Sequence, residues 1–229
     1  MEHKDRSAEQ LDAGARTARI LLDIEAVNFR PAQPYMLTAG WASPVYIDCR
    51  KVISYLDERR RLIALAGAMI ERDMETGHID FLAGGETAGI PYAAWISDAL
   101  SLPMLYVRKR PKGFGRDAQI EGNLTEGAKV VLIEDLATDC GSKLSFIEAL
   151  RAAGAVVSDV FVIFFYGAFP GAEENMAQAG AKLHYLADWW DVLERAEADG
   201  DFSADDVAGV KEFLADPIAW SAANGGRKA

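Results

Sequence analysis

One stretch of the chain combines the groups needed to bind a phosphorylated sugar. The apolar run 130–133 predicts a buried strand, and Glu134 and Asp135 are expected at its end. A turn of small and hydroxyl residues, 138–142, then leads into a helix expected over 143–151. The unpaired N–H groups of the turn and the positive end of the helix dipole can hold a phosphate. The two carboxylates can accept hydrogen bonds from ribose hydroxyls or hold a hydrated Mg2+.

Each of these features alone has an ordinary explanation, because acids at strand ends are usually only solvated and small-residue turns are often connectors. In this order, however, the apolar run, the two acids, two variable residues, Thr138 and the small residues resemble the 5-phosphoribosyl-1-diphosphate (PRPP) motif of type I phosphoribosyltransferases. Cys140 stands where that family usually has Gly. Its side chain is therefore expected to point away from the phosphate, or the loop to differ slightly.

Composition limits the classes of function that the chain can have. It has 229 residues, 50% of them hydrophobic, and a net charge of −11, which argues against nucleic acid as a partner. No apolar run reaches the length of a membrane span, and the charged start Met1–Arg6 lacks the apolar region of a signal peptide. Cys49 and Cys140 are too few for a disulfide framework or a metal cluster, so a cytoplasmic location is expected.

Against this acidic background, one segment is strongly basic. Five cations fall within nine residues: Arg108, Lys109, Arg110, Lys112 and Arg116. Most such runs are solvated loops, but these charges repel one another unless an anion lies among them. Because Gly113 and Gly115 allow the backbone many conformations, a mobile cationic loop that closes over a pyrophosphate is expected.

The same segment resembles the catalytic loop of orotate phosphoribosyltransferases. Arg108, Lys109 and Lys112 match the basic positions of that loop, and the sequence 120–122 (Ile-Glu-Gly) matches its end. Phe114 replaces a His found in many members. The resemblance therefore favours Lys112 as the residue that assists the leaving pyrophosphate.

Hydrophobic periodicity predicts an α/β fold. Helices are expected over 7–27, 56–74, 90–100, 141–153 and 172–179, and strands over 79–83, 103–107, 130–133, 156–166 and 182–185. Alternating strands and helices predict a mostly parallel sheet flanked by helices. The loops 84–89, 108–119 and 134–142 all leave the carboxyl ends of expected strands, so they are predicted to form one site.

Two further segments extend the resemblance. A small hairpin is expected over 35–48, with its turn near Ala39 and Gly40. In the overlapping stretch 40–54, Ser43, Pro44 and Tyr46 match a Ser-Pro-aromatic segment that lines the base pocket of these enzymes. The loop 84–89 is similar to a loop that binds pyrophosphate through backbone N–H groups.

Three positions depart from the family pattern. Thr38 and Ala88 stand where relatives have Lys, and no Arg follows the strand 156–166. Arg50 or Lys51 could replace that missing cation toward orotate.

The resemblance implies one phosphoribosyltransferase domain over 1–229, with a small N-terminal hood (residues 35–55) and a helical C-terminal extension (187–224) that packs on the sheet or on a partner subunit. The implied reaction converts PRPP and orotate into orotidine 5′-monophosphate and pyrophosphate. Its implied catalytic residues are Lys112, Asp135 and Glu134. PRPP would also contact Arg108, Lys109, Thr138, Asp139, Cys140, Gly141, Ser142, Glu86 and Thr87, and orotate would contact Tyr46, Ile47 and Thr138.

The resemblance also implies Mg2+ carried by PRPP, with no direct protein ligand but possible water-mediated contact to Glu134 and Asp135. It further implies a homodimer in which Arg108 serves the neighbouring site. Two alternatives stay open, namely a phosphoribosyltransferase for another nucleobase and a PRPP-sensing regulator without catalysis. The retained basic loop residues favour an enzyme.

Overall fold

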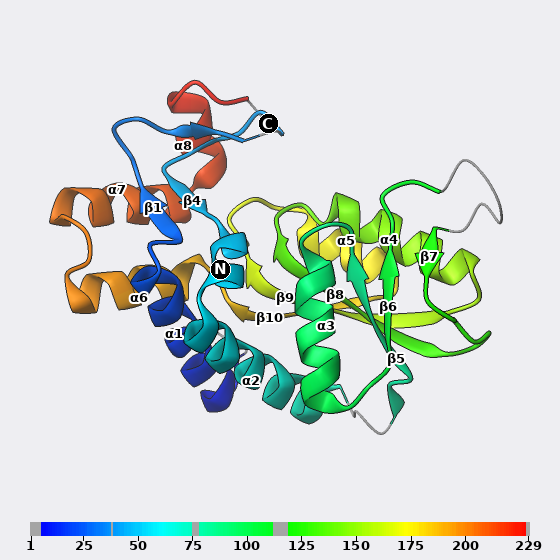
Figure 1. Cartoon of the computed structure of the whole chain (residues 1–229). Coiled ribbons are helices and arrows are strands. Elements are labelled where there is room, and N and C mark those ends of the chain that lie inside the picture. Colours follow the sequence, from blue (N-terminus) through cyan, green and yellow to red (C-terminus); the bar gives the residue numbers. More distant parts are fainter. Residues whose placement is uncertain (1–5, 38, 75–77, 112–118, 228–229) are drawn as a thin grey trace.

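The computed structural model describes residues 6–37, 39–74, 78–111 and 119–227, and a six-stranded sheet lies at its centre (Figure 1). The strand order is β10-β9-β8-β5-β6-β7, and all neighbouring pairs are parallel except β6 with β7. The strands are β5 (Phe81–Gly85), β6 (Met104–Val107), β7 (Ile120–Glu121), β8 (Lys129–Ala137), β9 (Val156–Phe165) and β10 (Lys182–Ala187). The expected mostly parallel α/β sheet is confirmed.

Helices cover both faces of this sheet (Figure 1). One face packs against α1 (Ala8–Asp23), α2 (Leu56–Asp73) and α3 (Gly89–Leu100), and the other against α4 (Gly141–Ala152) and α5 (Ala172–Gln178). Successive side chains of a strand point to opposite faces. Accordingly, Val131 and Ile133 pack in the first layer, while Val130 and Leu132 pack in the second.

The expected first helix is wrong at its end. Helix α1 stops at Asp23, and Glu25 then adopts a left-handed conformation with φ of 54°. The chain continues as β1 (Val27–Phe29), which pairs antiparallel with β4 (Val45–Ile47) of the hood. The apolar positions near residue 27 therefore belong to a short half-buried strand rather than to a last helical turn.

The hood contains the expected hairpin. Strands β2 (Tyr35–Met36) and β3 (Ala42–Ser43) pair antiparallel, and Gly40 in the connecting segment has φ of 85°, which favours glycine. Strand β4 follows but pairs with β1 outside the hairpin, and the 3-10 helix η1 (Cys49–Ser54) completes the hood.

The expected position of the acid pair relative to its strand is also wrong. Strand β8 does not end at Ile133 but continues to Ala137, so Glu134 and Asp135 lie inside it, with Glu134 opposite Val162 of β9. The apolar run marks only the part of the strand without charged groups. Backbone pairing with β9 continues beyond that run as far as Ala137, which lies opposite Phe165.

The C-terminal segment forms helices, as expected, and they pack on the rest of the chain. They are α6 (Trp189–Asp199), α7 (Ala204–Ala215) and α8 (Pro217–Ala223). Ser221 Oγ of α8 accepts a hydrogen bond of 2.9 Å from the N–H of Ala42. The Arg227 N–H donates to Gly40 O at 2.8 Å, and its guanidinium lies 3.9 Å from the ring centre of Trp41. The end of the chain thus supports the hood hairpin (Figure 1).

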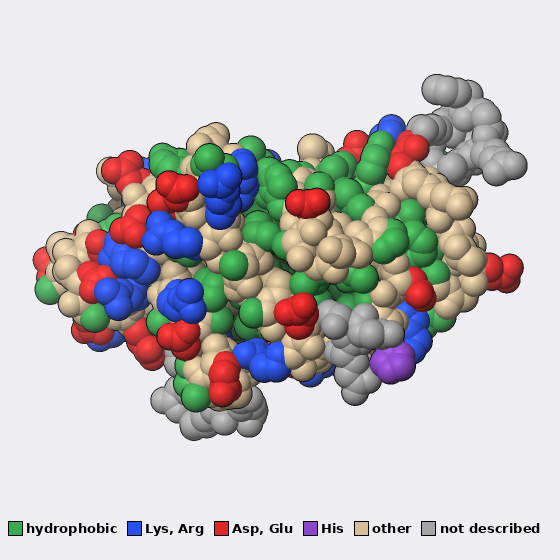
Figure 2. All heavy atoms as spheres, turned by 60° about the horizontal axis from the view of Figure 1, so that its bottom comes forward, with side chains coloured by type: hydrophobic (Ala, Val, Ile, Leu, Met, Phe, Trp, Pro, Cys, Tyr) green, Lys and Arg blue, Asp and Glu red, His purple; other side chains and the backbone are tan. Residues whose placement is uncertain are grey.

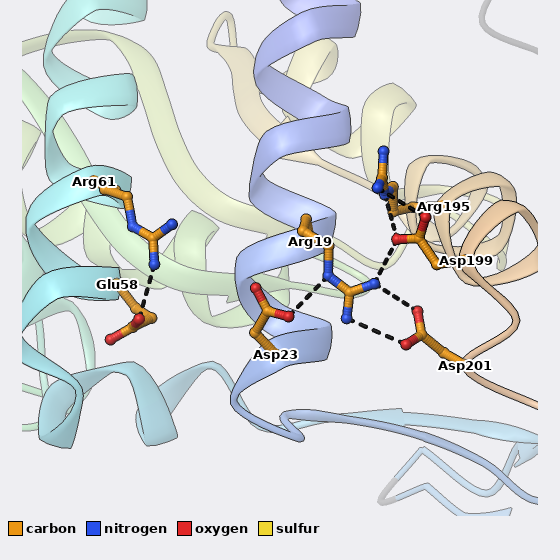
Figure 3. A network of polar contacts seen from close by, with 7 residues as sticks. All are labelled: Arg19, Asp23, Glu58, Arg61, Arg195, Asp199 and Asp201. Carbon is orange, nitrogen blue, oxygen red and sulfur yellow. Dashed lines mark hydrogen bonds and ion pairs between the residues drawn. The ribbon is translucent and has the colours of Figure 1, made fainter.

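An ion-pair network joins α1 to the end of α6 (Figure 3). Arg19 contacts Asp23 at 2.9 Å, Asp199 at 2.6 Å and Asp201 at 2.7 Å, and Asp199 also pairs with Arg195. At the left end of the view in Figure 2, cationic and anionic side chains are intermixed, whereas apolar and uncharged surface is more extensive across the middle of the view. Within the described segments, every helix is too short or too polar to cross a membrane.

Candidate active site

Three loops of interest leave adjacent strands at one edge of the sheet. Because β5 lies between β6 and β8, the segments that follow Gly85, Val107 and Ala137 are neighbours. A direct contact joins the first two, since the backbone N–H of Lys109 donates to Glu86 Oε2 at 2.7 Å. The described parts of the three loops therefore lie together at the carboxyl edge, as predicted, and this edge is where open parallel sheets bind ligands.

The acid pair is buried and its two side chains diverge. Glu134 is 6% exposed and Asp135 is 8% exposed. Glu134 Oε2 lies 3.0 Å from Nζ of Lys143 on α4, whereas Asp135 Oδ2 lies 3.8 Å from Nε of Arg50 on η1. Burial raises the pKa of both carboxyls, and Lys143 acts against this rise for each of them. The site thus places one carboxylate beside α4 and the other beside the hood.

Two glycines make room for the Glu134 carboxylate. A methyl group added at Gly85 or Gly89 would lie 2.4 Å or 2.5 Å from Glu134 Oε1. At Gly89 the same methyl would also lie 2.4 Å from Ile133 O. Glu134 therefore packs directly against the loop that follows β5, and only residues without a side chain fit beside it.

The turn before α4 has the form expected of a phosphate-binding loop. Thr138, Asp139, Gly141 and Ser142 are exposed, while Cys140 is 1% exposed and packs in the core beside α4. Of the two expectations for Cys140, the buried side chain fits the one in which it points away from the phosphate. Its φ of 63° lies in the left-handed region, which glycine adopts more readily than other residues do.

One donor of this turn is already engaged. The Asp139 Oδ1 atom accepts a hydrogen bond of 3.1 Å from the N–H of Gly141, at the first residue of α4. A phosphate at the helix N-terminus would compete with this carboxylate for the same N–H group. Binding there therefore requires the Asp139 side chain to turn away.

The loop after β5 and the start of the basic segment lie at the surface. Thr87 is exposed, Glu86 is half-buried, and the peptide bond that joins them is cis. Arg108 Nη1 lies 3.6 Å from Glu121 Oε1 of β7, so this cation is anchored at the sheet edge. Lys109 is exposed. Lys112 lies outside the described residues, as do Phe114 and Arg116.

The hood supplies the residues predicted to meet the base. Tyr46 is 43% exposed, and its ring centre lies 5.2 Å from that of Tyr35. Ile47 is 4% exposed with its side chain in the core, so only its backbone could contact a ligand. The two candidate cations are also distinguished. Arg50 approaches Asp135, whereas Lys51 Nζ donates to Glu25 O at 2.8 Å.

Sequence reasoning missed Lys143. This side chain is buried, pairs with Glu134 at 3.0 Å, and donates to Ser142 Oγ at 3.3 Å. The sequence did contain a signal that could have identified Lys143: it is a cation in the first turn of a helix, where the helix dipole disfavours positive charge. Such a residue is expected only where a nearby carboxylate compensates it.

Comparisons with known proteins agree with this geometry. No family model matches the chain. Orotate phosphoribosyltransferase of Dinoroseobacter shibae is 49% identical over 216 residues, covering 94% of this chain and 96% of that protein. Among solved structures, UMP synthase of Leishmania donovani has a TM-score of 0.75 at 27% identity, covering 88% of this chain and 42% of that longer one. Orotate phosphoribosyltransferase of Aeropyrum pernix has a TM-score of 0.68 at 29% identity, and the match covers 79% of this chain and 99% of that one.

The mostly parallel sheet, with an acid pair on β8 ahead of the turn 138–142, has the fold of the type I phosphoribosyltransferases. Curated relatives that are about half identical over most of the chain identify the family within this class. The chain belongs to the orotate phosphoribosyltransferase family. It is thus an enzyme of pyrimidine biosynthesis, and the expected function is confirmed. The alternatives of another nucleobase and of a non-catalytic regulator are not favoured.

Proposed function

We propose that the edge formed by β8, β5 and β6 binds PRPP and orotate and transfers the phosphoribosyl group between them. The observation that carries this proposal is that three neighbouring strands bring these features together: the acid pair and the turn after it on β8, the loop after β5, and the start of the cationic segment after β6. The N–H groups of 138–142, with the hydroxyls of Thr138 and Ser142, would hold the 5′-phosphate. Gly141 would become available once Asp139 turns away.

Asp135 and Glu134 would accept hydrogen bonds from the ribose hydroxyls. Their negative charge would favour the positive charge that develops at the ribose C1 as pyrophosphate departs. Glu86, Thr87, Arg108 and Lys109 would surround the pyrophosphate. Lys112, assigned from the sequence alone, would assist the leaving group.

Orotate would bind between Tyr46, the backbone of Ile47 and Thr138. Its carboxylate needs a cation, and Arg50 is better placed than Lys51 because its guanidinium already lies beside Asp135. The side chain of Arg50 is 69% exposed, so it can turn toward a ligand.

The donor set suits a magnesium ion that arrives with the substrate. Among the described residues, no three His, Cys, Asp or Glu side chains are grouped so that they could hold a metal ion. Mg2+ commonly binds to one or two carboxylates, through water, together with substrate phosphates. When bound, it would neutralise pyrophosphate charge, with Glu134 and Asp135 reached through water.

A homodimer is also part of the proposal. Ile53, Tyr55 and Leu56 are 38%, 42% and 49% exposed at the junction of η1 and α2. Nearby, the Arg59 guanidinium lies 4.4 Å from the ring centre of Trp95. Exposed apolar residues grouped in this way are typical of interfaces. Light scattering should give the mass of two chains, and a monomer at all concentrations would contradict this part. A cytoplasmic location stays a prediction.

Orotate consumption tests the whole proposal. The ultraviolet absorbance of orotate should change only when PRPP and Mg2+ are both present, and a panel of other bases should give no turnover. Asp135→Asn should lower kcat/KM about 100-fold, the scale for losing one group that stabilises transition-state charge. Glu148→Gln, an exposed carboxylate change on α4, is the matched control. Lys112→Ala should lower kcat more than tenfold, and unchanged turnover would remove Lys112 from the mechanism.

A further inference from the structure

Two tyrosine hydroxyls from the core fix the hood strand β4 at its two ends. The Tyr166 hydroxyl is hydrogen-bonded to Ser43 Oγ and lies 3.1 Å from Val45 O. Beyond the other end of β4, the Tyr92 hydroxyl of α3 donates to Cys49 O at 2.7 Å. Tyr166 is 3% exposed and Tyr92 is fully buried, so neither hydrogen bond competes with bulk water.

Tyr166 also contacts the phosphate-binding side of the site. It follows β9 directly, and its backbone N–H donates to Ala137 O at 2.7 Å. Ala137 is the last residue of β8 and precedes the turn that begins at Thr138. One residue therefore joins the base of the phosphate turn through its backbone to the hood through its side chain.

The ring of Tyr166 is held independently of its hydroxyl. It packs edge-on against Trp189, with ring centres 5.3 Å apart, and lies parallel to Phe169 at 6.1 Å. Burial raises the pKa of Tyr166, so the hydroxyl stays neutral and can donate. Removing only the hydroxyl should thus leave the ring in place and loosen the hood at the Ser43 end of β4.

We propose that Tyr166 is a positioning residue for base recognition, which sets the distance between the phosphate turn and the hood residues that meet the base. This inference rests on the proposed binding of the base beside Tyr46 and Ile47. These residues lie on β4, between the contacts made by Tyr166 and Tyr92. A hood released at its Ser43 end would weaken base binding while leaving the phosphate turn and the acid pair unchanged.

Tyr166→Phe is the direct test. The KM for orotate should rise at least fivefold, while the KM for PRPP and kcat stay within twofold of wild type. The matched control is Tyr185→Phe on β10, whose ring packs with Phe165 on the α4 and α5 side of the sheet. An orotate KM within twofold of wild type, or an equal rise in the control, would overturn the proposal. So would an equal rise in the KM for PRPP.

Ser43→Ala provides a second route should Tyr166→Phe fold poorly. It removes the partner hydroxyl and should raise the orotate KM to a similar extent. The double variant should raise the orotate KM by clearly less than the product of the two single effects, because both substitutions remove the Ser43–Tyr166 contact, although each also removes a contact to Val45. Additive effects would instead place the two hydroxyls in separate roles and overturn the proposal. If wild type used another base in place of orotate, the proposed substrate would fail. The KM for that base would then still decide the role of Tyr166.

Discussion

Replacing Lys143 with Met tests whether the buried ion pair maintains the acid pair. Met retains an apolar stem but lacks the ammonium, so Glu134 Oε2 loses the partner that lies 3.0 Å away. Both side chains are less than a tenth exposed, so water cannot substitute for the lost charge. Removing one partner of a buried ion pair costs about 3–5 kcal/mol. That is a large part of a typical stability of roughly 5–15 kcal/mol.

The loss should depend on pH. Burial raises the pKa of Glu134, and the charge of Lys143 is the strongest influence that lowers it. Without Lys143 the pKa rises further above the value of about 4.3 in an unfolded chain. The folded variant then keeps a proton that the unfolded chain releases, so its stability falls as pH rises above about 4–5. The deficit relative to wild type should therefore be larger near pH 8 than near pH 5.

Urea unfolding followed by circular dichroism at both pH values measures this deficit. The double variant Lys143→Met/Glu134→Gln should recover part of the lost stability, because no buried charge is left unpaired. A deficit below about 1 kcal/mol at both pH values, as found for exposed pairs, would refute the reasoning. It would show that the pair is screened by solvent and does not organise the site.

Two further predictions concern the same region. Gly89→Ala should lower stability by about 1–3 kcal/mol, the usual cost of overpacking, because the added methyl meets Ile133 O and Glu134 Oε1. A urea midpoint equal to that of wild type would contradict the described packing. Burial raises the pKa of Cys140 to about 11 and the pKa of Cys49 well above its ordinary value. Iodoacetamide near pH 8 should therefore label neither thiol in the native protein and both in denaturant, and rapid native labelling would contradict their burial.

Much of the fold follows from local sequence signals. The apolar run 130–133, the small-residue turn at 138–142 and the helix after it predict a strand, a loop and a helix in order. The same reasoning predicts the two earlier strands, over 79–83 and 103–107. Because the carboxyl ends of parallel strands meet at one edge of a sheet, the loops that follow all three strands are then expected at that edge. The convergence of the site was predictable because it depends on strand order and direction rather than on individual side chains.

Long-range contacts could not be predicted in this way. Nothing local distinguishes Glu134 inside a strand from Glu134 after it, because the compensating Lys143 lies on a different element. Ser43 and Tyr166, whose hydroxyls meet in the core, are 123 residues apart. Strand β1 was likewise missed, since three residues carry too little pattern to outweigh the helix before them.

Support of the hood by the last helix has a consequence for biosynthesis. The hydrogen bond from the Ala42 N–H can form only after Ser221 has been synthesised, 179 positions later in the chain. At about 5–20 residues per second, the ribosome needs roughly 10–40 s to supply that partner. By the time this partner is made, the acid pair and the turn 138–142 have already been synthesised. The hood hairpin therefore gains the support of α8 only when almost the whole chain has been made, so any chain that ends before residue 217 lacks this contact.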